Sequence, residues 1–342
     1  MGRTVLVTGV CRKLGGRFAR RLTEDPAVDR VVGVDIVPPR TDLGAVQFVR
    51  ADIRNPVIAK VIAAEAVDTV VHLGVISTPS GAGGRTPMKE INVIGTMQLL
   101  AACQQARGIE RLVVKSSARV YGSSSRDPAM FTEGMTPKRI PRSGFAKDSV
   151  EVEAYVRGFA RRRPDVQLTT LRCANLIGPT IQTTLTRYFE LPLIPTVLGF
   201  DPRLQFCHED DALEALRVAT VSDVDGTYNV AGDGVLMLSQ AIRRLGRPSV
   251  ALPGPALGML GTVFPAARAA ELTPEQTEFL TFGRGIDTSA ARKALGFTST
   301  YTTAEAFDTF ARSLRPGALN AERIGALEAQ LSDLLAKAGS RG

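Results

Sequence analysis

The sequence predicts an α/β protein with a doubly wound parallel sheet and a smaller, mixed lobe toward its C-terminal end. Short apolar runs alternate with helical patterns over the first half of the chain, which is typical of successive βαβ units. Six runs have the length and composition of buried strands: residues 4–8, 30–35, 46–49, 69–73, 111–116 and 167–172. After about residue 175 the pieces become shorter and less regular, and this change predicts the second lobe.

Helical patterns and start signals define the later elements. Amphipathic spacing predicts helices over residues 88–106 and 211–220, and an apolar run predicts a strand over residues 227–230. Pro274 follows Thr273 at the favoured first position of a helix, and Thr302 with Glu305 forms a capping box. We therefore expect regular structure almost to the end of the chain.

Composition and charge exclude several classes of protein. Of 342 residues, 44% are hydrophobic and 22% charged, which excludes a disordered, collagen-like or coiled-coil chain. The net charge of +8 comes partly from basic clusters at residues 12–21 and 157–163. These clusters lack the interleaved aromatic residues that stack on bases, so we expect them to form solvated helix faces and expect no nucleic-acid partner. The uncharged stretch 248–267 is broken by prolines, so we expect no membrane span.

The cysteines and the N-terminal residues bear on the cellular compartment. The four cysteines lack CxxC spacing and only two histidines are present, so we expect no metal site and a reducing environment. The first residues lack the pattern of a signal peptide. Together these observations predict a cytoplasmic protein.

A glycine-rich turn follows the first predicted strand and opens a helix. Gly9 and Gly15 let the backbone turn sharply and approach a diphosphate, whose charge the N–H groups at the helix start would stabilise. Asp35 ends the second strand, where a carboxylate would accept hydrogen bonds from ribose hydroxyls. The two features predict a Rossmann-like site for NAD or NADP.

The predicted elements divide the chain into three parts. Residues 1–175 are expected to form an NAD(P)-binding Rossmann domain, to which the chain returns around residues 201–232. Residues 176–315 are expected to form mainly a substrate-binding lobe. Residues 316–342 carry a heptad-like apolar stripe, which predicts an amphipathic C-terminal helix. This helix docks on its own domain or pairs with a second copy in a homodimer, and the sequence leaves both open.

Several motifs occur in the order and spacing of one known superfamily. They are Asp52-Ile53, Val71-His72-Leu73-Gly74, Asn92-Val93-Ile94-Gly95-Thr96, Ser116-Ser117-Ala118-Arg119-Val120-Tyr121-Gly122, Leu171-Arg172-Cys173-Ala174-Asn175-Leu176-Ile177-Gly178-Pro179 and the segment from Phe206 to Asp211. With these motifs, residues 3–315 resemble the extended short-chain dehydrogenase/reductase superfamily, in particular its NAD-dependent epimerase/dehydratase branch, which includes UDP-glucose 4-epimerase. The resemblance implies an enzyme that binds NAD and acts on a small molecule, typically a nucleotide sugar.

The resemblance also implies a set of cofactor-binding residues. They are Gly9, Arg12, Leu14, Gly15, Asp35, Asp52, Ile53, Leu73, Gly74, Asn92, Ser116 and Lys147. Arg12 stands where the family has its middle glycine, so that either its guanidinium contacts a phosphate or the turn is wider. Because Asp35 would repel a 2′-phosphate, we expect NAD rather than NADP.

The catalytic residues depart from the family pattern. Enzymes of this family use a Ser or Thr together with Tyr and Lys in a YxxxK motif, and here Ser117 and Lys147 match while Ser143 takes the tyrosine position. An aliphatic hydroxyl is a far weaker acid than a phenol, so Ser143 cannot carry the proton without another base. Tyr121 is the nearest alternative tyrosine, although its family counterpart belongs to the scaffold. His72 and His208 match no catalytic position of the family.

Two residues are candidates for substrate binding. Asn175 matches a substrate-contacting position of sugar epimerases, and Arg203 lies one residue before Leu204, where nucleotide-sugar enzymes often place an arginine. The apolar stretch 191–200 is either core of the second lobe or the lining of an apolar pocket.

Three functions are compatible with these residues. The first is a nucleotide-sugar epimerase, dehydratase or reductase with non-standard catalytic residues. The second is a weakly active or inactive NAD(H)-binding sensor or scaffold, as the missing tyrosine suggests. The third is an oxidoreductase on an apolar alcohol or ketone.

Overall fold

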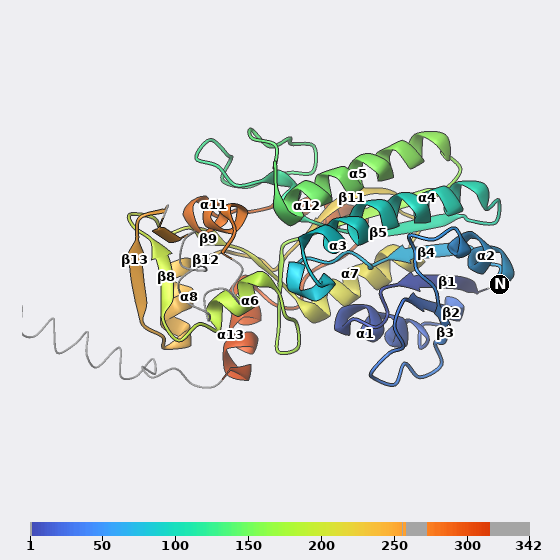
Figure 1. Ribbon diagram of the computed structural model, residues 1–342, viewed down its shortest axis with the longest axis horizontal. Helices are drawn as coiled ribbons and strands as arrows, with labels where there is room; N and C mark the ends of the chain where they lie inside the picture. The colour runs from blue at the N-terminus through green and yellow to red at the C-terminus, as the bar shows by residue number, and fades with distance from the viewer. Residues whose placement is uncertain (1, 255, 258–271, 315–342) are drawn as a thin grey trace, which may run out of the picture.

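A computed structural model of the protein describes residues 2–254, 256–257 and 272–314. Figure 1 shows an elongated molecule with a central sheet and its helices at one end and a smaller lobe at the other. Among the described residues, no helix is both long and apolar enough to cross a bilayer. The predicted C-terminal helix, residues 316–342, lies outside the described residues.

The large domain contains a seven-stranded parallel sheet with the strand order β11-β6-β5-β4-β1-β2-β3. Its strands are β1 (Arg3–Thr8), β2 (Val28–Asp35), β3 (Gln47–Arg50), β4 (Thr69–His72), β5 (Arg111–Ser117), β6 (Gln167–Cys173) and β11 (Gly226–Val230). The order reverses between β1 and β4, the place where open α/β sheets bind ligands. This is the doubly wound Rossmann-like fold predicted from the alternating pattern.

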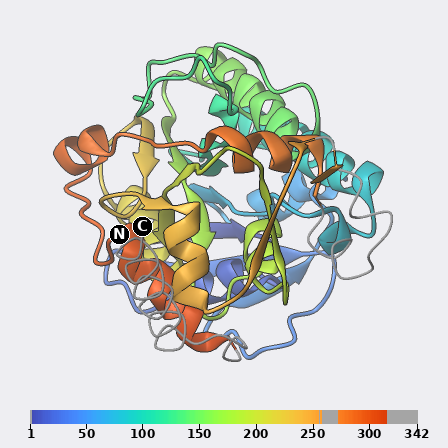
Figure 2. The ribbon, with the colours of Figure 1, turned by 90° about the vertical axis from the view of Figure 1, so that its left-hand side faces the viewer.

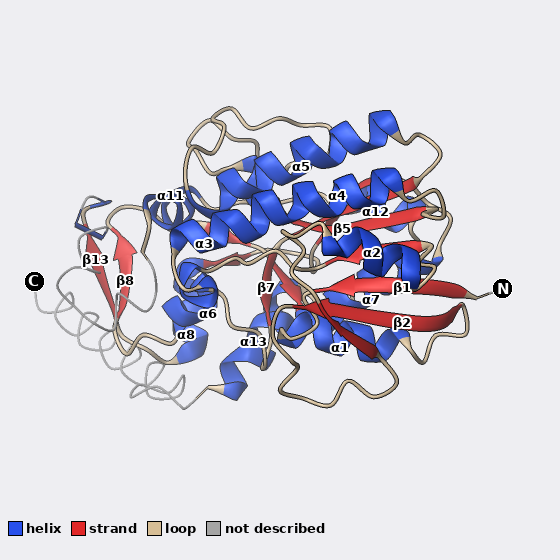
Figure 3. Cartoon of the chain, turned by 45° about the vertical axis from the view of Figure 1, so that its right-hand side comes forward, coloured by secondary structure: helices blue, strands red, loops and turns tan. Residues whose placement is uncertain are grey.

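Helices cover both faces of this sheet (Figure 3). On one face α1 (Lys13–Leu22) packs beside α7 (Glu209–Val221), and on the other α2 (Val57–Ala64), α4 (Thr96–Gln105) and α5 (Gly144–Arg162) lie together. Each face has its own apolar core, because Val and Leu side chains alternate between the two sides of the strands. The carboxyl ends of the strands point toward the smaller lobe.

The smaller lobe is built from short strand pairs and helices. Its strands are β7 (Asn175–Ile177), β8 (Ile194–Val197), β9 (Arg203–Leu204), β10 (Phe206–His208), β12 (Leu236–Met237) and β13 (Ser249–Leu252), and its helices are α6 (Thr184–Phe189), α8 (Leu238–Leu245), α11 (Pro274–Phe282) and α13 (Thr303–Ser313). Figure 2, seen from the small-lobe end, shows α8 and α13 side by side. The chain returns to the large domain at α7 and β11, and α12 (Ser289–Ala294) packs on β11.

The predicted start signals are present, whereas one long helix is interrupted. Thr273 caps α11, and Thr302 and Glu305 form the capping box of α13. The helix predicted over residues 88–106 begins earlier, as α3 (Arg85–Lys89), and contains a π-helical turn at Glu90–Gly95 before α4. π-helical turns insert an extra residue and often occur beside functional sites.

Candidate cofactor and active site

The glycine turn after β1 leaves no room for a side chain at Gly9 or at Gly15. Gly9 has a φ of +79°, and a Cβ built there would lie 2.9 Å from the Cα of Gly74 at the end of β4. A Cβ on Gly15 would overlap the carbonyl oxygen of Gly9. Both obstacles are backbone atoms, so the close approach of β1, β4 and α1 requires glycine at these positions.

The start of α1 is prepared for an anion. Arg12 is the N-cap residue but makes no side-chain cap hydrogen bond, and no acidic residue occupies the first turn. The first-turn N–H groups therefore lack the side-chain acceptor that usually satisfies them. Uncapped N–H groups and the helix dipole together favour a bound phosphate.

Two cavities lie at the carboxyl edge of the sheet on either side of this turn. The large edge cavity, of about 480 Å³, includes Arg12, Leu14, Gly15 and Leu73 in its lining. The small edge cavity, of about 50 Å³, is lined in part by Gly9, Arg12, Asp35, Asp52, Ile53 and Gly74. Nine of the twelve predicted cofactor residues therefore line one or both cavities.

Asp35 presents its carboxylate beside the glycine turn. Its Oδ2 accepts a hydrogen bond from the Cys11 N–H at 3.0 Å, and its Oδ1 accepts from the Ile36 N–H at 2.8 Å. A carboxylate has about four acceptor sites, so capacity remains for two ribose hydroxyls. Burial, reinforced by the Asp35 carboxylate, raises the pKa of the Cys11 thiol to about 12. Cys11 is therefore a neutral neighbour at physiological pH.

Arg12 bridges the two cavities. Its exposed side chain contributes to the lining of both, and Nη2 donates to the Gly81 carbonyl oxygen at 3.3 Å. The arginine in the middle-glycine position thus reaches across the crevice to the turn at Pro79–Ala82. The resulting positive charge lies next to the uncapped start of α1, where a phosphate is favoured.

In the lining of the small edge cavity, Asp52 is held by Arg54. The two side chains form an ion pair of 2.7 Å between Oδ2 and Nη2, and the hydrogen bonds from Arg54 lower the pKa of Asp52. Asp52 is therefore ionised under ordinary conditions and keeps a fixed orientation beside Ile53.

Three predicted cofactor residues lie outside the edge cavities. Asn92 is fully buried in the π-helical turn and braces the chain after β4 through two hydrogen bonds with the backbone of Ile76. Ser116 is buried and donates to Glu153 of α5 at 2.6 Å. Lys147 places Nζ 3.8 Å from Glu151 one turn further along α5. Asn92 and Ser116 therefore support the crevice from behind instead of facing it.

The predicted catalytic hydroxyls lie on two segments joined by an ion pair. The Ser117 hydroxyl accepts a hydrogen bond from the Arg119 N–H at 3.3 Å. Arg119 also binds Glu275 of α11 at 2.8 Å, and Glu275 accepts from the Ala146 N–H in the first turn of α5 at 3.2 Å. The Arg119–Glu275 pair thus ties the end of β5 to the start of α5.

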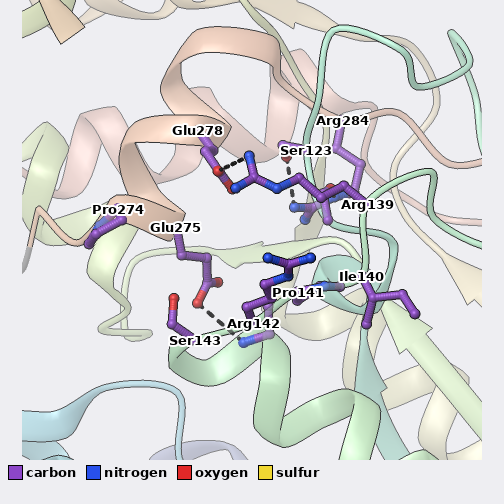
Figure 4. A pocket seen from close by; sticks show the side chains of 12 residues that line it. Ser123, Arg139, Ile140, Pro141, Arg142, Ser143, Pro274, Glu275, Glu278 and Arg284 are labelled. Carbon is purple, nitrogen blue, oxygen red and sulfur yellow. Dashed lines mark hydrogen bonds and ion pairs between the residues drawn. The ribbon is translucent and has the colours of Figure 1, made fainter. Parts of the chain in front are cut away.

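Ser143, which holds the tyrosine position, opens into a separate cavity. It is the exposed N-cap residue of α5, and its hydroxyl makes no cap hydrogen bond. Figure 4 shows Ser143 beside Glu275 in this cavity of about 140 Å³, with Arg139, Arg142 and Arg284 also in its lining. Neither Ser117 nor Lys147 lines it. The structure therefore does not gather the predicted catalytic side chains in one cavity.

Tyr121, the alternative proton carrier, is buried beneath the end of β5. It is 1% exposed, its hydroxyl donates to Asn229 at 2.8 Å and accepts from Arg172 at 2.9 Å, and its ring stacks on Phe131. Desolvation raises the pKa of Tyr121 above its ordinary value. The Tyr121 hydroxyl is therefore enclosed and already bonded on both sides, a setting that favours a structural role over proton transfer.

The candidate substrate residues are separated. Asn175 begins β7 directly before Leu176, which lines the large edge cavity. Arg203 is exposed on β9 and lines another cavity of about 450 Å³, formed with Phe200, Phe282 and Arg284. The stretch 191–200 contributes Leu191, Ile194 and Val197 to the small-lobe core, and none of its residues lines an edge cavity.

The large edge cavity contains polar residues that the motif analysis did not identify. Lys115 comes from β5, Arg40 from the loop after β2, and Thr180, Thr183 and Arg187 from the region after β7. Lys115 could have been found, because a lysine directly follows the buried run Leu112-Val113-Val114 within one strand. The others carry no local signal, since only the folded chain brings them to the sheet edge.

Known proteins match both the sequence and the fold. An uncharacterized protein of Mycobacterium tuberculosis strain H37Rv is 48% identical over 345 residues, covering 99% of this chain and 92% of that protein. UDP-glucose 4-epimerase 2 of Oryza sativa subsp. japonica is 30% identical over 195 residues, covering 52% of this chain and 45% of the relative.

Two solved structures illustrate the likeness in fold. UDP-glucose 4-epimerase from Thermotoga maritima with UDP-glucose has a TM-score of 0.70 and 16% identity, covering 91% of this chain and 98% of its own. UDP-glucuronic acid 4-epimerase from Bacillus cereus, in complex with UDP-glucuronic acid and NAD, has a TM-score of 0.69 and 19% identity with the same coverage. At these identities the likeness establishes the fold alone.

The sequence profile of one family spans both the glycine turn and the edge strand β11. The profile of the NAD-dependent epimerase/dehydratase family matches residues 5–231, which include all seven strands of the sheet except the first residues of β1. The predicted resemblance is confirmed, and the chain belongs to the NAD-dependent epimerase/dehydratase family.

Proposed function

We propose that the protein binds NAD across the two edge cavities and acts on a nucleotide sugar by transient hydride transfer, with non-standard catalytic residues. The observation that carries the proposal is the convergence of nine predicted cofactor residues on these cavities at the point where the strand order reverses. When bound, NAD would accept and return a hydride.

The residues of the crevice suit the parts of a dinucleotide. The Gly9–Gly15 turn and the uncapped start of α1 would hold the diphosphate, with Arg12 adding a guanidinium. Asp35 would bind the ribose hydroxyls and disfavour a 2′-phosphate by charge repulsion, which supports NAD over NADP.

The reaction site would lie toward the smaller lobe. Ser117 would polarise the reacting hydroxyl or carbonyl, and Lys147 would hold the cofactor ribose in place of its present contact with Glu151. Ser143 lacks the acidity of a phenol, so proton transfer would need another base, for which a water between Ser143 and Lys147, one turn apart at the start of α5, is our candidate. Asn175 and Arg203 remain candidates for substrate contact.

A nucleotide sugar is the favoured substrate class on two grounds. The solved structures from Thermotoga maritima and Bacillus cereus hold UDP-glucose and UDP-glucuronic acid, respectively. In this chain, the large edge cavity continues beyond the glycine turn to Leu176, Thr180 and Thr183, leaving room beside the dinucleotide. The apolar stretch 191–200 lines neither edge cavity, and its Phe200 opens into a separate cavity, so the cofactor crevice itself gives no support for an apolar alcohol or ketone.

A second candidate function is binding of NAD(H) with little or no turnover, as in a sensor or scaffold protein. It is supported by the position of Ser143, which opens into a cavity that neither Ser117 nor Lys147 lines. The two candidates share the cofactor site and differ only in catalysis.

One experiment tests the proposal and separates the candidates. Calorimetric titration with NAD and NADP measures cofactor binding, and proton NMR then follows UDP-glucose, UDP-glucuronic acid and dTDP-glucose incubated with the NAD-loaded protein. The proposal expects NAD to bind more tightly than NADP and a new sugar product to form from at least one substrate. NAD binding without any product would favour the second candidate, and absence of NAD binding would refute both.

A further inference from the structure

A lysine of the central sheet lies inside the large edge cavity. Lys115 is half-buried near the carboxyl end of β5, two residues before Ser117. Neighbouring Ser116 points to the opposite face of the sheet, where it bonds Glu153 of α5, and Val113 belongs to the core beneath α1 and α7. Because side chains alternate along a strand, Lys115 lies on the α1 and α7 side, and there it lines the cavity.

In the part of the chain that the structure describes, no carboxylate lies within ion-pair distance of this charge. Among the described residues, Lys115 forms no ion pair or hydrogen bond, unlike Lys147 and Lys89, which both approach Glu151. The groups that feel its charge are the thiols of Cys173 and Cys207, which are buried and hydrogen-bonded to each other. The hydrogen bond with Cys207 and the charge of Lys115 lower the pKa of Cys173, and the carboxylate of Asp211 also acts on Cys207. A partly buried ammonium without an ion-pair partner is costly, and such groups commonly mark a functional site.

The charge is also remote from the predicted diphosphate site. β5 is separated from β1 by β4, so the two strand ends are about 10 Å apart at the usual spacing of parallel strands. The glycine turn already has Arg12 and Lys13 beside it. Lys115 therefore lies toward the part of the cavity that Leu176, Thr180 and Thr183 line, next to Ser117.

The oxidised nicotinamide ring of NAD is a cation, as is the ammonium of Lys115. Among the described residues, no acidic side chain contributes to the lining of the large edge cavity. Two positive charges in a partly desolvated space repel each other unless an anion lies near them. We propose that Lys115 binds a carboxylate on the sugar ring of the substrate, so that the substrate class is a nucleotide sugar with a uronic acid. This inference rests on the proposed function, and it assigns a specificity residue within that site.

The test compares two ligands that differ at one carbon of the sugar. UDP-glucuronic acid carries a carboxylate where UDP-glucose carries a hydroxymethyl group, so the ratio of their dissociation constants isolates the charge. Both are titrated calorimetrically into the NAD-loaded wild-type protein and into the Lys115→Met and Lys115→Arg variants. Methionine keeps the length of the side chain without its charge, and removing an unpaired buried charge does not weaken the fold.

We expect the wild-type protein to bind UDP-glucuronic acid at least about tenfold more tightly than UDP-glucose, as a hydrogen bond to a charged group would give. Lys115→Met should reduce this preference to about twofold or less, and Lys115→Arg should retain most of it. Lys13→Met is the matched control. It removes a cation from the same cavity at the glycine turn and should weaken NAD binding while leaving the preference between the sugars unchanged.

The outcomes distinguish this inference from the proposed function. Equal binding of the two sugars by the wild-type protein, or an unchanged preference in Lys115→Met, would overturn the role of Lys115 and leave the proposed function intact. If neither sugar nucleotide bound to the NAD-loaded protein, both the nucleotide-sugar proposal and this inference would be refuted.

Discussion

Replacing Gly9 by alanine tests whether the glycine turn is sterically required. Gly9 has a φ of +79°, which costs an alanine about 1–2 kcal/mol. The added Cβ would also lie 2.9 Å from the Cα and 3.1 Å from the nitrogen of Gly74. These are backbone atoms that no rotamer change can move, and forced overpacking adds about 1–3 kcal/mol. We therefore expect Gly9→Ala to lower the free energy of unfolding by about 2–5 kcal/mol.

Gly234 provides a matched control elsewhere in the chain. Its φ is +78°, but a Cβ there would meet no atom within 4 Å. Gly234→Ala should therefore cost only the conformational penalty of about 1–2 kcal/mol. The effect of alanine on the unfolded chain is the same in both variants and cancels in the comparison.

Urea unfolding monitored by circular dichroism measures both free energies, and calorimetry with NAD measures the effect on the cofactor site. We expect the Gly9 variant to be the less stable of the two by about 1–3 kcal/mol and to lose detectable NAD affinity, while the Gly234 variant binds NAD normally. Equal losses of stability, or unchanged NAD affinity in Gly9→Ala, would show that the close approach to Gly74 is unimportant.

Three further predictions concern individual side chains. Asp35→Ala should raise the dissociation constant of NAD by about 10- to 100-fold by removing charged hydrogen bonds, and it should reduce discrimination against NADP. Unchanged dissociation constants of NAD and NADP, measured by calorimetry, would contradict the role of Asp35 in binding the ribose. Ser143→Tyr should raise the rate of sugar turnover by about tenfold or more, because the introduced phenol would supply a general acid on the same face of α5 as Lys147. An unchanged rate, measured by NMR, would show that the missing phenol is not what limits catalysis. Burial lowers the pKa of His72 to about 4, below its unfolded value of about 6.5, so the neutral histidine stabilises the fold above pH 6.5 and this stability declines as the pH falls toward 4. Between these two pH values the free energy of unfolding should decrease by about 3 kcal/mol. The urea midpoint of the His72→Gln variant should therefore fall less steeply with decreasing pH than that of the wild-type protein. Parallel curves for the two proteins would contradict this.

The sheet could be predicted from the sequence because its physical signals are local. Each central strand is a short apolar run between turn residues, and the structure contains a strand at all six predicted places. Helix starts at Thr273 and Thr302 were likewise predictable, since capping involves residues only three apart. The interruption of the helix over residues 88–106 was not, because it depends on Asn92 bonding to Ile76 in a neighbouring segment.

The cofactor-binding half of the candidate site could be predicted from local signals, whereas the surroundings of the catalytic candidates could not. The ends of the first two strands fix the positions of Gly9, Gly15 and Asp35 in the sequence. In the structure these three residues line the two edge cavities. The surroundings of Ser143 depend on Glu275, which lies far along the chain on α11 and enters through tertiary packing. No spacing rule connects such residues, so sequence motifs indicated the catalytic candidates without showing how they are separated.

A crystal structure of the protein grown with millimolar NAD would test the cofactor site most directly. We predict density for the dinucleotide along the carboxyl edge of the sheet, with its diphosphate at the Gly9–Gly15 turn and a ribose hydrogen-bonded to Asp35. NAD bound elsewhere, or a crevice free of NAD under these conditions, would contradict the proposed function.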